Sequence, residues 1–205
     1  MSSVIVDMGM SLDGYIAGPN GGPQNPLGDG GTLIHWWVYD LASWRESLGL
    51  AGGQTNRDDE VVKESNARVG AYVMGRRMFD EGEVGWPDPP SFRAPVFVLT
   101  NNVREPWVRQ GGTTFTFVTD GIESALEQAR AAAGAKDVRI AGGAKAVGQF
   151  IEAGLVDELQ IHLAPVLLGE GVRLFGGIDP QSVELESTRV IDSPRVTHLR
   201  YRVVK

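Results

Sequence analysis

Short apolar runs alternate with longer amphipathic segments along most of the chain. Five of these runs are rich in Val, Ile, Phe or Ala and end at polar or glycine-rich positions, which predicts buried β-strands. The strands are expected at residues 4–10, 71–74, 95–100, 115–119 and 138–141.

Helical signals lie between these strands. Trp37, Leu41, Trp44 and Leu48 recur at helical spacing, which predicts a helix over residues 34–48. Four further helices are predicted from signals that favour a helix N-terminus. Their starts are the acidic run 58–60, the Gly-Arg-Arg run 75–77, Asp120 with Glu123 at N-cap and N3 spacing, and the pair Gly142-Gly143.

The C-terminal part of the chain has a different pattern. Three long segments of alternating character, residues 158–164, 183–190 and 196–204, follow one another with few helical signals between them. Strands that alternate with helices predict a mainly parallel sheet, and the strand-rich end predicts antiparallel strands at one edge. The predicted fold class is therefore α/β, a three-layer α/β/α sandwich around a sheet of roughly eight strands.

Composition and charge narrow the function classes. The 205 residues are 42% hydrophobic with a formal net charge of −7, which excludes a disordered chain and disfavours nucleic acid or an anionic membrane as the main partner. The lack of cysteine excludes disulfides, cysteine-ligated metals and thiol nucleophiles. No basic run followed by an apolar stretch opens the chain, so we expect a cytoplasmic protein. The Gly/Pro-rich segment 19–31 is interpreted as a functional loop, and residues 1–205 as a single domain.

Two strand ends combine glycine with cationic residues, in VMGRRM at 73–78 and RIAGGAK at 139–145. In a parallel sheet, ligands bind at the carboxyl ends of the strands, where helix N-termini present free N–H groups. Glycine allows a phosphate to approach the backbone, and Arg or Lys neutralises it. Two such corners favour a ligand with phosphates at two points, such as a dinucleotide. The alternative is that both are ordinary strand–helix turns with their cations on the surface.

Other polar positions give weaker signals. The three histidines, His35, His162 and His198, lack the spacing of a metal-ligand set, so we expect no metal site. His162 and His198 alternate with apolar neighbours and are predicted to be exposed or hydrogen-bonded on the opposite sheet face. Asp13 follows the first predicted strand, where catalytic acids often lie. It could equally be a turn carboxylate that caps backbone N–H groups beside Gly14.

Five segments in this order resemble the dihydrofolate reductase fold family, specifically the reductase domain of the riboflavin-biosynthesis deaminase–reductases. They are MSLDGYIAG at 10–18, VMGRRMFD at 73–80, FVLTNN at 97–102, RIAGGAKAVGQF at 139–150 and DELQIHLAPVLLGEGVRLF at 157–175. The resemblance implies an NADPH-dependent oxidoreductase and a homodimer. Its implied reaction is hydride transfer to a C=N or C=O carbon of a pterin- or ribosylaminopyrimidine-like heterocycle, as in a 5-amino-6-(5-phosphoribosylamino)uracil reductase.

The resemblance also assigns cofactor contacts to residues of this sequence. It places cofactor phosphate at Gly75, Arg76 and Arg77, and the adenosine 2′-phosphate near Thr100 and Asn101. It places the pyrophosphate at Gly142, Gly143, Ala144 and Lys145, and the nicotinamide beside Gly9, Ile16 and Ala17.

Departures from the folate-reducing members favour a heterocycle smaller than dihydrofolate. Asp59 falls near the carboxylate that binds the pterin in those members, but acidic neighbours flank it at the helix start. Asp13 and Asp59 are the candidates for donating the proton or orienting the substrate. Trp36, Trp37 and Trp44 either cover the pocket or belong to the core or a dimer contact. A non-catalytic dinucleotide-binding module of the same fold remains an alternative, as does a reductase that uses NADH or a deazaflavin.

Overall fold

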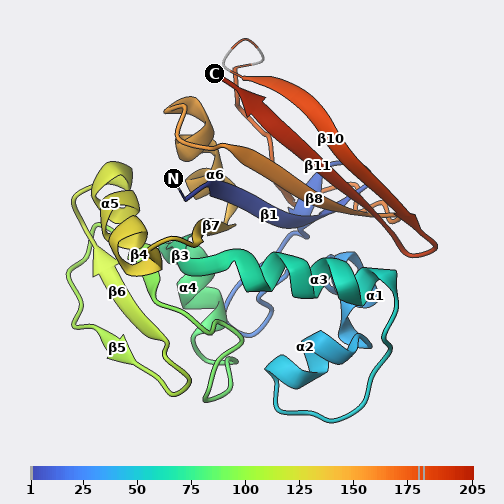
Figure 1. Cartoon of the computed structure of the whole chain (residues 1–205), viewed down its shortest axis with the longest axis horizontal. Coiled ribbons are helices and arrows are strands. Elements are labelled where there is room, and N and C mark those ends of the chain that lie inside the picture. The colour runs from blue at the N-terminus through green and yellow to red at the C-terminus, as the bar shows by residue number, and fades with distance from the viewer. Residues whose placement is uncertain (1, 180, 182) are drawn as a thin grey trace.

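A nine-stranded sheet forms the centre of the computed structural model, which describes residues 2–179, 181 and 183–205 (Figure 1). Together with a separate two-stranded sheet, the strands are β1 (Val4–Ser11), β2 (Tyr15–Ala17), β3 (Val69–Gly75), β4 (Val96–Leu99), β5 (Trp107–Val108), β6 (Thr114–Val118), β7 (Asp137–Gly142), β8 (Glu158–Ala164), β9 (Val172–Arg173), β10 (Glu184–Ser193) and β11 (Val196–Val204). The order in the large sheet is β10-β11-β8-β1-β7-β3-β4-β6-β5, and β2 pairs with β9 in the small one.

The central strands of the large sheet, from β8 to β6, run parallel to one another. At one edge, β11 and β10 pair antiparallel, which confirms the mainly parallel sheet and the antiparallel C-terminal strands expected from the sequence. The other edge also ends in an antiparallel strand, β5, which has only two residues and was not predicted.

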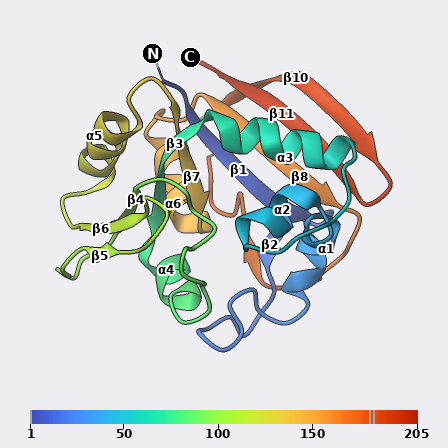
Figure 2. The same cartoon turned by 60° about the horizontal axis from the view of Figure 1, so that its bottom comes forward.

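Helices cover both faces of the sheet. They are the 3-10 helix η1 (Gly31–His35) and the α-helices α1 (Trp36–Tyr39), α2 (Ala42–Ser47), α3 (Arg57–Arg68), α4 (Arg76–Gly82), α5 (Ile122–Ala133) and α6 (Ala144–Glu152). Helices α5 and α6 pack on one face, whereas α1 to α4 lie on the other, where α3 crosses β1 and β8 (Figure 2). This arrangement confirms the predicted three-layer sandwich. None of the helices in the described part of the chain is long and apolar enough to cross a bilayer.

The apolar core follows the alternation of the strands. Val4 and Val6 of β1 face the cluster built with α5 and α6, and Ile5 faces the cluster around α4. The next residue on the same face of β1 as Ile5 is Asp7, and from there on this face of the sheet is polar. Because side chains alternate along a strand, the polar residues of neighbouring strands gather opposite α3.

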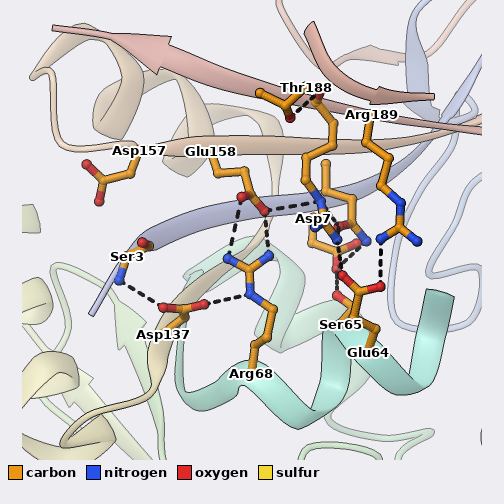
Figure 3. A network of polar contacts seen from close by, with 12 residues as sticks. Ser3, Asp7, Glu64, Ser65, Arg68, Asp137, Asp157, Glu158, Thr188 and Arg189 are labelled. Atoms are coloured by element: carbon orange, nitrogen blue, oxygen red, sulfur yellow. Dashed lines mark hydrogen bonds and ion pairs between the residues drawn. The ribbon is translucent and has the colours of Figure 1, made fainter. Parts of the chain in front are cut away.

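Helix α3 therefore packs on the sheet through charged and polar side chains. Figure 3 shows Arg68 reaching from α3 to Asp137 of β7 and Glu158 of β8, at 2.8 and 2.7 Å. Farther along the helix, Ser65 donates to Asp7. Paired charges therefore add to the apolar contacts of Val61 and Val62, and the position of α3 depends on the geometry of both.

Two helix predictions are wrong in detail. The predicted helix 34–48 is divided into η1, α1 and α2, because Leu41 adopts an extended conformation and bridges to Gln54. The predicted N-cap Asp120 does not cap α5. Its neighbour Gly121 takes that position with a φ of 96°, a conformation that favours glycine.

Candidate active site

A cleft of about 1100 Å³ lies at the carboxyl ends of the parallel strands. The last residues of β3, β4, β6 and β7 all line it: Gly75, Leu99, Val118 and Gly142. The inner wall comes from β1 and β2, and the loop 19–31 contributes Pro26 and Leu27. This is where open parallel sheets bind ligands.

All the residues that the family resemblance assigned to a cofactor lie on the lining of this one cleft. They are Gly9, Ile16, Ala17, Gly75, Arg76, Arg77, Thr100, Asn101, Gly142, Gly143, Ala144 and Lys145. They come from five separate stretches of the chain, and the sheet brings them together. Their role in binding stays a prediction.

The first glycine corner joins β3 to α4. Gly75 is the N-cap of α4, and Arg76 forms an ion pair with Asp80 at 2.6 Å. The Arg76 guanidinium also lies 3.4 Å from the Thr100 hydroxyl, which links this corner to the end of β4. Arg77 is 64% exposed and pairs with Glu81 at 2.7 Å. Both cations are thus held at the cleft by i,i+4 pairs on α4.

The second corner joins β7 to α6. Gly142 has a φ of 122°, and a Cβ there would lie 3.2 Å from the Met8 side chain, so the position favours glycine. Gly143 is the N-cap of α6, and among the residues that the structure describes no side chain caps this helix start. A Cβ placed on Gly75 would lie 3.7 Å from the Gly143 nitrogen, so the two corners are adjacent. The open N–H groups of α6 and the exposed Lys145 favour an anion there.

The inner end of the cleft holds two titratable residues that sequence reasoning missed, Asp7 and His35. A Cβ on Gly9 would come within 2.9 Å of His35 Cε1, so glycine makes room for the imidazole. Burial, followed by the charge of nearby His162, lowers the pKa of His35 to about 4. His35 is therefore a neutral imidazole at neutral pH.

Asp7 is an ionised carboxylate whose side chain is 8% exposed. Burial would raise its pKa, but Arg139 at 3.1 Å and His162 at 2.8 Å outweigh burial and hold the pKa well below its ordinary value. Ser65 also donates to it. The break of the apolar run in β1 at Asp7 was the sequence signal that could have identified it.

The structure places both predicted catalytic carboxylates away from the cleft lining. Asp13 accepts from the backbone N–H groups of Leu168 and Gly169, at 3.1 and 2.7 Å. A 2.6 Å hydrogen bond from Ser11 is the main cause that lowers the pKa of Asp13 to about 2. Asp13 thus has the geometry of the turn carboxylate that the sequence left as the alternative.

Asp59 is held within the layer of α2 and α3. It accepts from the Ser43 N–H and forms an ion pair with Lys63, both at 2.8 Å. Its side chain is 1% exposed. Because these partners occupy it away from the cleft, its position does not support a role in donating a proton there.

Trp37 and the two remaining histidines form a buried group behind the inner wall of the cleft. Trp37 packs against His162 and His198, Trp44 packs on Tyr39, and these tryptophans do not line the cleft. Trp36 is largely exposed and is also absent from the lining. The two histidines do lie on the predicted sheet face, where both are buried and hydrogen-bonded, so the exposed alternative is wrong.

Comparisons with known proteins agree with this architecture. The model of the RibD C-terminal domain family matches residues 2–199. A putative riboflavin biosynthesis protein from Shewanella sp. PV-4 is similar in structure, with 25% identity, a TM-score of 0.66 and 100% of each chain covered.

Two further solved structures, each 16% identical, show the fold alone. One is a dihydrofolate reductase from Enterococcus faecalis complexed with NADP(H) and RAB-propyl, with a TM-score of 0.55, 99% of this chain and 97% of that chain covered. The other is a diaminohydroxyphosphoribosylaminopyrimidine deaminase/5-amino-6-(5-phosphoribosylamino)uracil reductase from Thermotoga maritima, with a TM-score of 0.58, 99% of this chain and 57% of that chain covered. The dihydrofolate reductase-like fold expected from the sequence is confirmed.

Proposed function

Because this chain belongs to the RibD C-terminal domain family, we propose that it is an NADPH-dependent reductase of a small heterocycle. The reaction is hydride transfer to a C=N or C=O carbon of a pterin- or ribosylaminopyrimidine-like compound. The adjacency of the two glycine-and-cation corners on one cleft is the observation that carries the proposal.

The cleft fits a dinucleotide in its shape and its charge. The open backbone at Gly143 and the uncapped start of α6 suit the pyrophosphate, with Lys145 beside them. Arg76, Arg77 and the Thr100 hydroxyl suit a further phosphate at the outer end of the cleft. The cofactor is therefore proposed to lie with its adenosine end at β4 and its nicotinamide at β1.

At the inner end, the chain's own residues orient the substrate beside the nicotinamide, which when bound supplies the hydride. Gly9, Ile16 and Ala17 form the wall on which the nicotinamide packs. His35 offers a neutral imidazole that donates from one nitrogen and accepts at the other, and Asp7 offers a fixed anionic acceptor. This pair suits a heterocycle that carries ring N–H, amino and carbonyl groups.

Cofactor titration by calorimetry tests the proposal. We expect NADPH to bind the native chain, and Arg76→Ala or Arg77→Ala to weaken NADPH about tenfold or more, with a far smaller effect on NADH. Arg130→Ala is the matched control, since Arg130 is an exposed arginine of α5 outside the cleft lining.

Each opposing result removes a defined part of the proposal. No heat and no thermal shift with millimolar NADPH would end the reductase assignment. Equal losses for NADPH and NADH would remove the 2′-phosphate contact. Tight NADPH binding without oxidation by any pterin, aminopyrimidine or carbonyl compound would favour the non-catalytic binding module.

The proposed homodimer has a surface on which it can be tested. Strand β10 is an edge strand whose residues are mostly exposed, including the apolar Leu185 and Val190. Unpaired edges of this kind can pair or pack with a second copy. Light scattering should give twice the 22.1 kDa of one chain, and a monomer mass would refute the dimer.

A further inference from the structure

A line of four titratable side chains leads from the cleft into the polar layer under α3. Asp7 Oδ1, at the cleft, lies 2.8 Å from His162 Nε2. His162 Nδ1 lies 2.6 Å from His198 Nδ1, and His198 Nε2 lies 3.0 Å from Asp58 Oδ1. The strand pairing fixes the two rings, because His162 of β8 and His198 of β11 are directly opposite in register.

These distances set the number of protons in the line. Both atoms of each of the three contacts carry lone pairs, so each contact needs one proton between them. Two neutral imidazoles bring one proton each, and ionised carboxylates bring none. The line therefore holds one proton more than two neutral histidines supply, and the rings of His162 and His198 share it.

The surroundings favour one shared proton and oppose a second. The carboxyl groups of Asp7 and Asp58 flank the pair within 2.8 and 3.0 Å, and the anionic Asp7 stabilises a single positive charge. Burial and the charge of the neighbouring His162 lower the pKa of His198, so a second cation is disfavoured. Trp37 packs on both rings and separates them from water.

The remaining polar groups around this line come from every element packed against it. Arg139 of β7 and Ser65 of α3 bind Asp7, and Ser193 of β10 donates to Asp58. Gln160 of β8 lies beside His162 and accepts from Arg200 of β11. His35 of η1 approaches from the cleft and is neutral. Of these groups, the cation Arg139 contacts Asp7 and the cation Arg200 contacts Gln160. The histidine pair itself contacts a carboxyl group at each end, Asp7 on one side and Asp58 on the other.

We infer that the His162–His198 pair is a buried proton reservoir, which delivers one proton from His162 Nε2 through Asp7 to the substrate in the cleft and is left neutral. This inference rests on the proposed reductase function and deepens it, because reduction of a C=N or C=O bond needs a proton on nitrogen or oxygen as well as a hydride on carbon. Asp7 touches the cleft, and the two histidines act through it.

The proton transfer balances over the four groups. The Nε2–H bond of His162 breaks and an O–H bond forms on Asp7, while the proton between the rings stays on His162 Nδ1. Asp7 then gives its proton to the nitrogen or oxygen atom that gains charge as the hydride arrives, and returns to a carboxylate. The pair is left neutral. After product release, water in the cleft returns one proton along the same route.

The low pKa of Asp7 is consistent with this order of events. At rest the proton stays on the histidine pair, because ionised Asp7 is strongly favoured. A protonated Asp7 is then a short-lived, strong acid, and it is useful only when a basic atom forms beside it.

Nuclear magnetic resonance tests the shared proton without any substrate. In protein labelled with nitrogen-15 histidine at neutral pH, we expect three ring protons on the pair, one on each Nε2 and one strongly deshielded proton between the two Nδ1 atoms. The proton between the rings should be absent in His198→Gln. As pH rises and the pair becomes neutral, the proton on His162 Nε2 should be lost, whereas the proton between the rings stays on His162 Nδ1. A His162 Nε2 that carries no proton at neutral pH in the native chain, which is the signature of a neutral pair, would overturn the inference.

Kinetics test delivery to the cleft, with NADPH and a panel of dihydropterin, dihydrofolate and 5-amino-6-(5-phosphoribosylamino)uracil. We expect native kcat to fall as pH rises and the pair loses its proton. His198→Gln should remove that step and lower kcat about 10²-fold, with NADPH affinity within about twofold of native. Asp58→Asn keeps both rings but removes the carboxylate beside His198, so the fall in kcat should occur at lower pH. This variant tests proton delivery if His198→Gln does not fold. Glu64→Gln is the matched control, because it removes an α3 carboxylate that binds Arg189 and Arg200.

The outcomes separate this inference from the proposed function. Unchanged kcat and pH profile in both variants, with native turnover, would overturn the reservoir and leave the reductase intact. If native protein binds no NADPH, the reductase proposal and proton delivery fall together, while the resonance still reports whether the rings share a proton.

Discussion

Removing the ring of Phe79 should disrupt both the aromatic cluster under α4 and the arginine corner of the cleft. Phe79 is fully buried. Its ring centroid lies between 5.0 and 5.9 Å from those of four other aromatic rings. These belong to Trp86, Trp107, Phe115 and Phe117, and Phe79 thereby fixes α4 on β6 and its neighbours.

The magnitude follows from the burial of the side chain. Transfer of a buried phenylalanine side chain to water costs about 1.5–3 kcal/mol, and the cavity left by Phe79→Ala raises the loss to about 3–5 kcal/mol. The edge-to-face contacts place Phe79 at the upper end of that range, at about 4–5 kcal/mol. Since whole domains are stable by only about 5–15 kcal/mol, this is a large part of the total.

Urea unfolding followed by tryptophan fluorescence measures the loss. The midpoint should fall with little change in slope, and Phe79→Leu should lose less than Phe79→Ala. Phe175→Ala is the control, because Phe175 is 40% exposed and should lose far less. NADPH affinity should also fall in Phe79→Ala, since the Arg76 guanidinium lies 5.9 Å from the lost ring. A loss below about 1 kcal/mol would refute the assigned packing of α4.

Three further predictions concern single residues around the cleft. Asp7→Asn leaves Arg139 without its buried partner and should cost about 3–5 kcal/mol in urea unfolding at pH 7. Because folding lowers the pKa of Asp7, this contribution is full above the unfolded value near 3.8 and is lost as pH falls below it; a pH-independent loss would contradict the assignment. Asp13→Ala should lower the melting temperature, because Asp13 accepts from loop N–H groups, and should leave NADPH affinity unchanged, because Asp13 is not on the cleft lining. Weaker NADPH binding by this variant would show that Asp13 contributes to the site. Gly9→Ala should lower the free energy of unfolding by about 1–3 kcal/mol, because the added Cβ displaces His35. The control Gly148→Ala lies in α6 with open space at its Cβ and should raise the free energy of unfolding by about 0.5–1 kcal/mol. Equal effects of the two changes would refute the close approach of His35 to Gly9.

Local pattern was sufficient for the parts of the fold that local forces decide. The Val- and Ile-rich runs form strands close to their expected bounds, and the acidic run 58–60 begins α3, whose N-cap is Asn56. The segment 34–48 was mispredicted because a distant residue, Gln54, holds Leu41 in an extended conformation. Helical spacing cannot register such a contact.

The part of the cleft lining that lies at glycine-containing turns could be predicted from the sequence. Gly75 and Gly143 mark backbone that a phosphate can approach, and that signal is local to each turn. The titratable residues at the inner end of the cleft have no such signal. Asp13 lies beside a glycine at a strand end, which led to its prediction as a catalytic candidate. In the structure, its carboxylate accepts hydrogen bonds from the N–H groups of Leu168 and Gly169, more than 150 residues away. Asp7 lies inside a strand, where a carboxylate gains a role only from partners on other strands.

Helix α3 explains why those partners could not be inferred from sequence. Its sequence RDDEVVKESNAR has the composition of a solvated surface helix, yet Asp58 and Ser65 are buried against the sheet. The opposing face of β1, β8 and β11 is equally polar, so each side satisfies charges that neither could bury alone. Complementarity of two polar faces appears only when both are assembled. It follows that Asp7, at the cleft, is fixed by residues of α3, β7 and β8. Substitutions of Asp58 or Ser65 in α3, which never touch a ligand, should therefore alter the chemistry of the cleft.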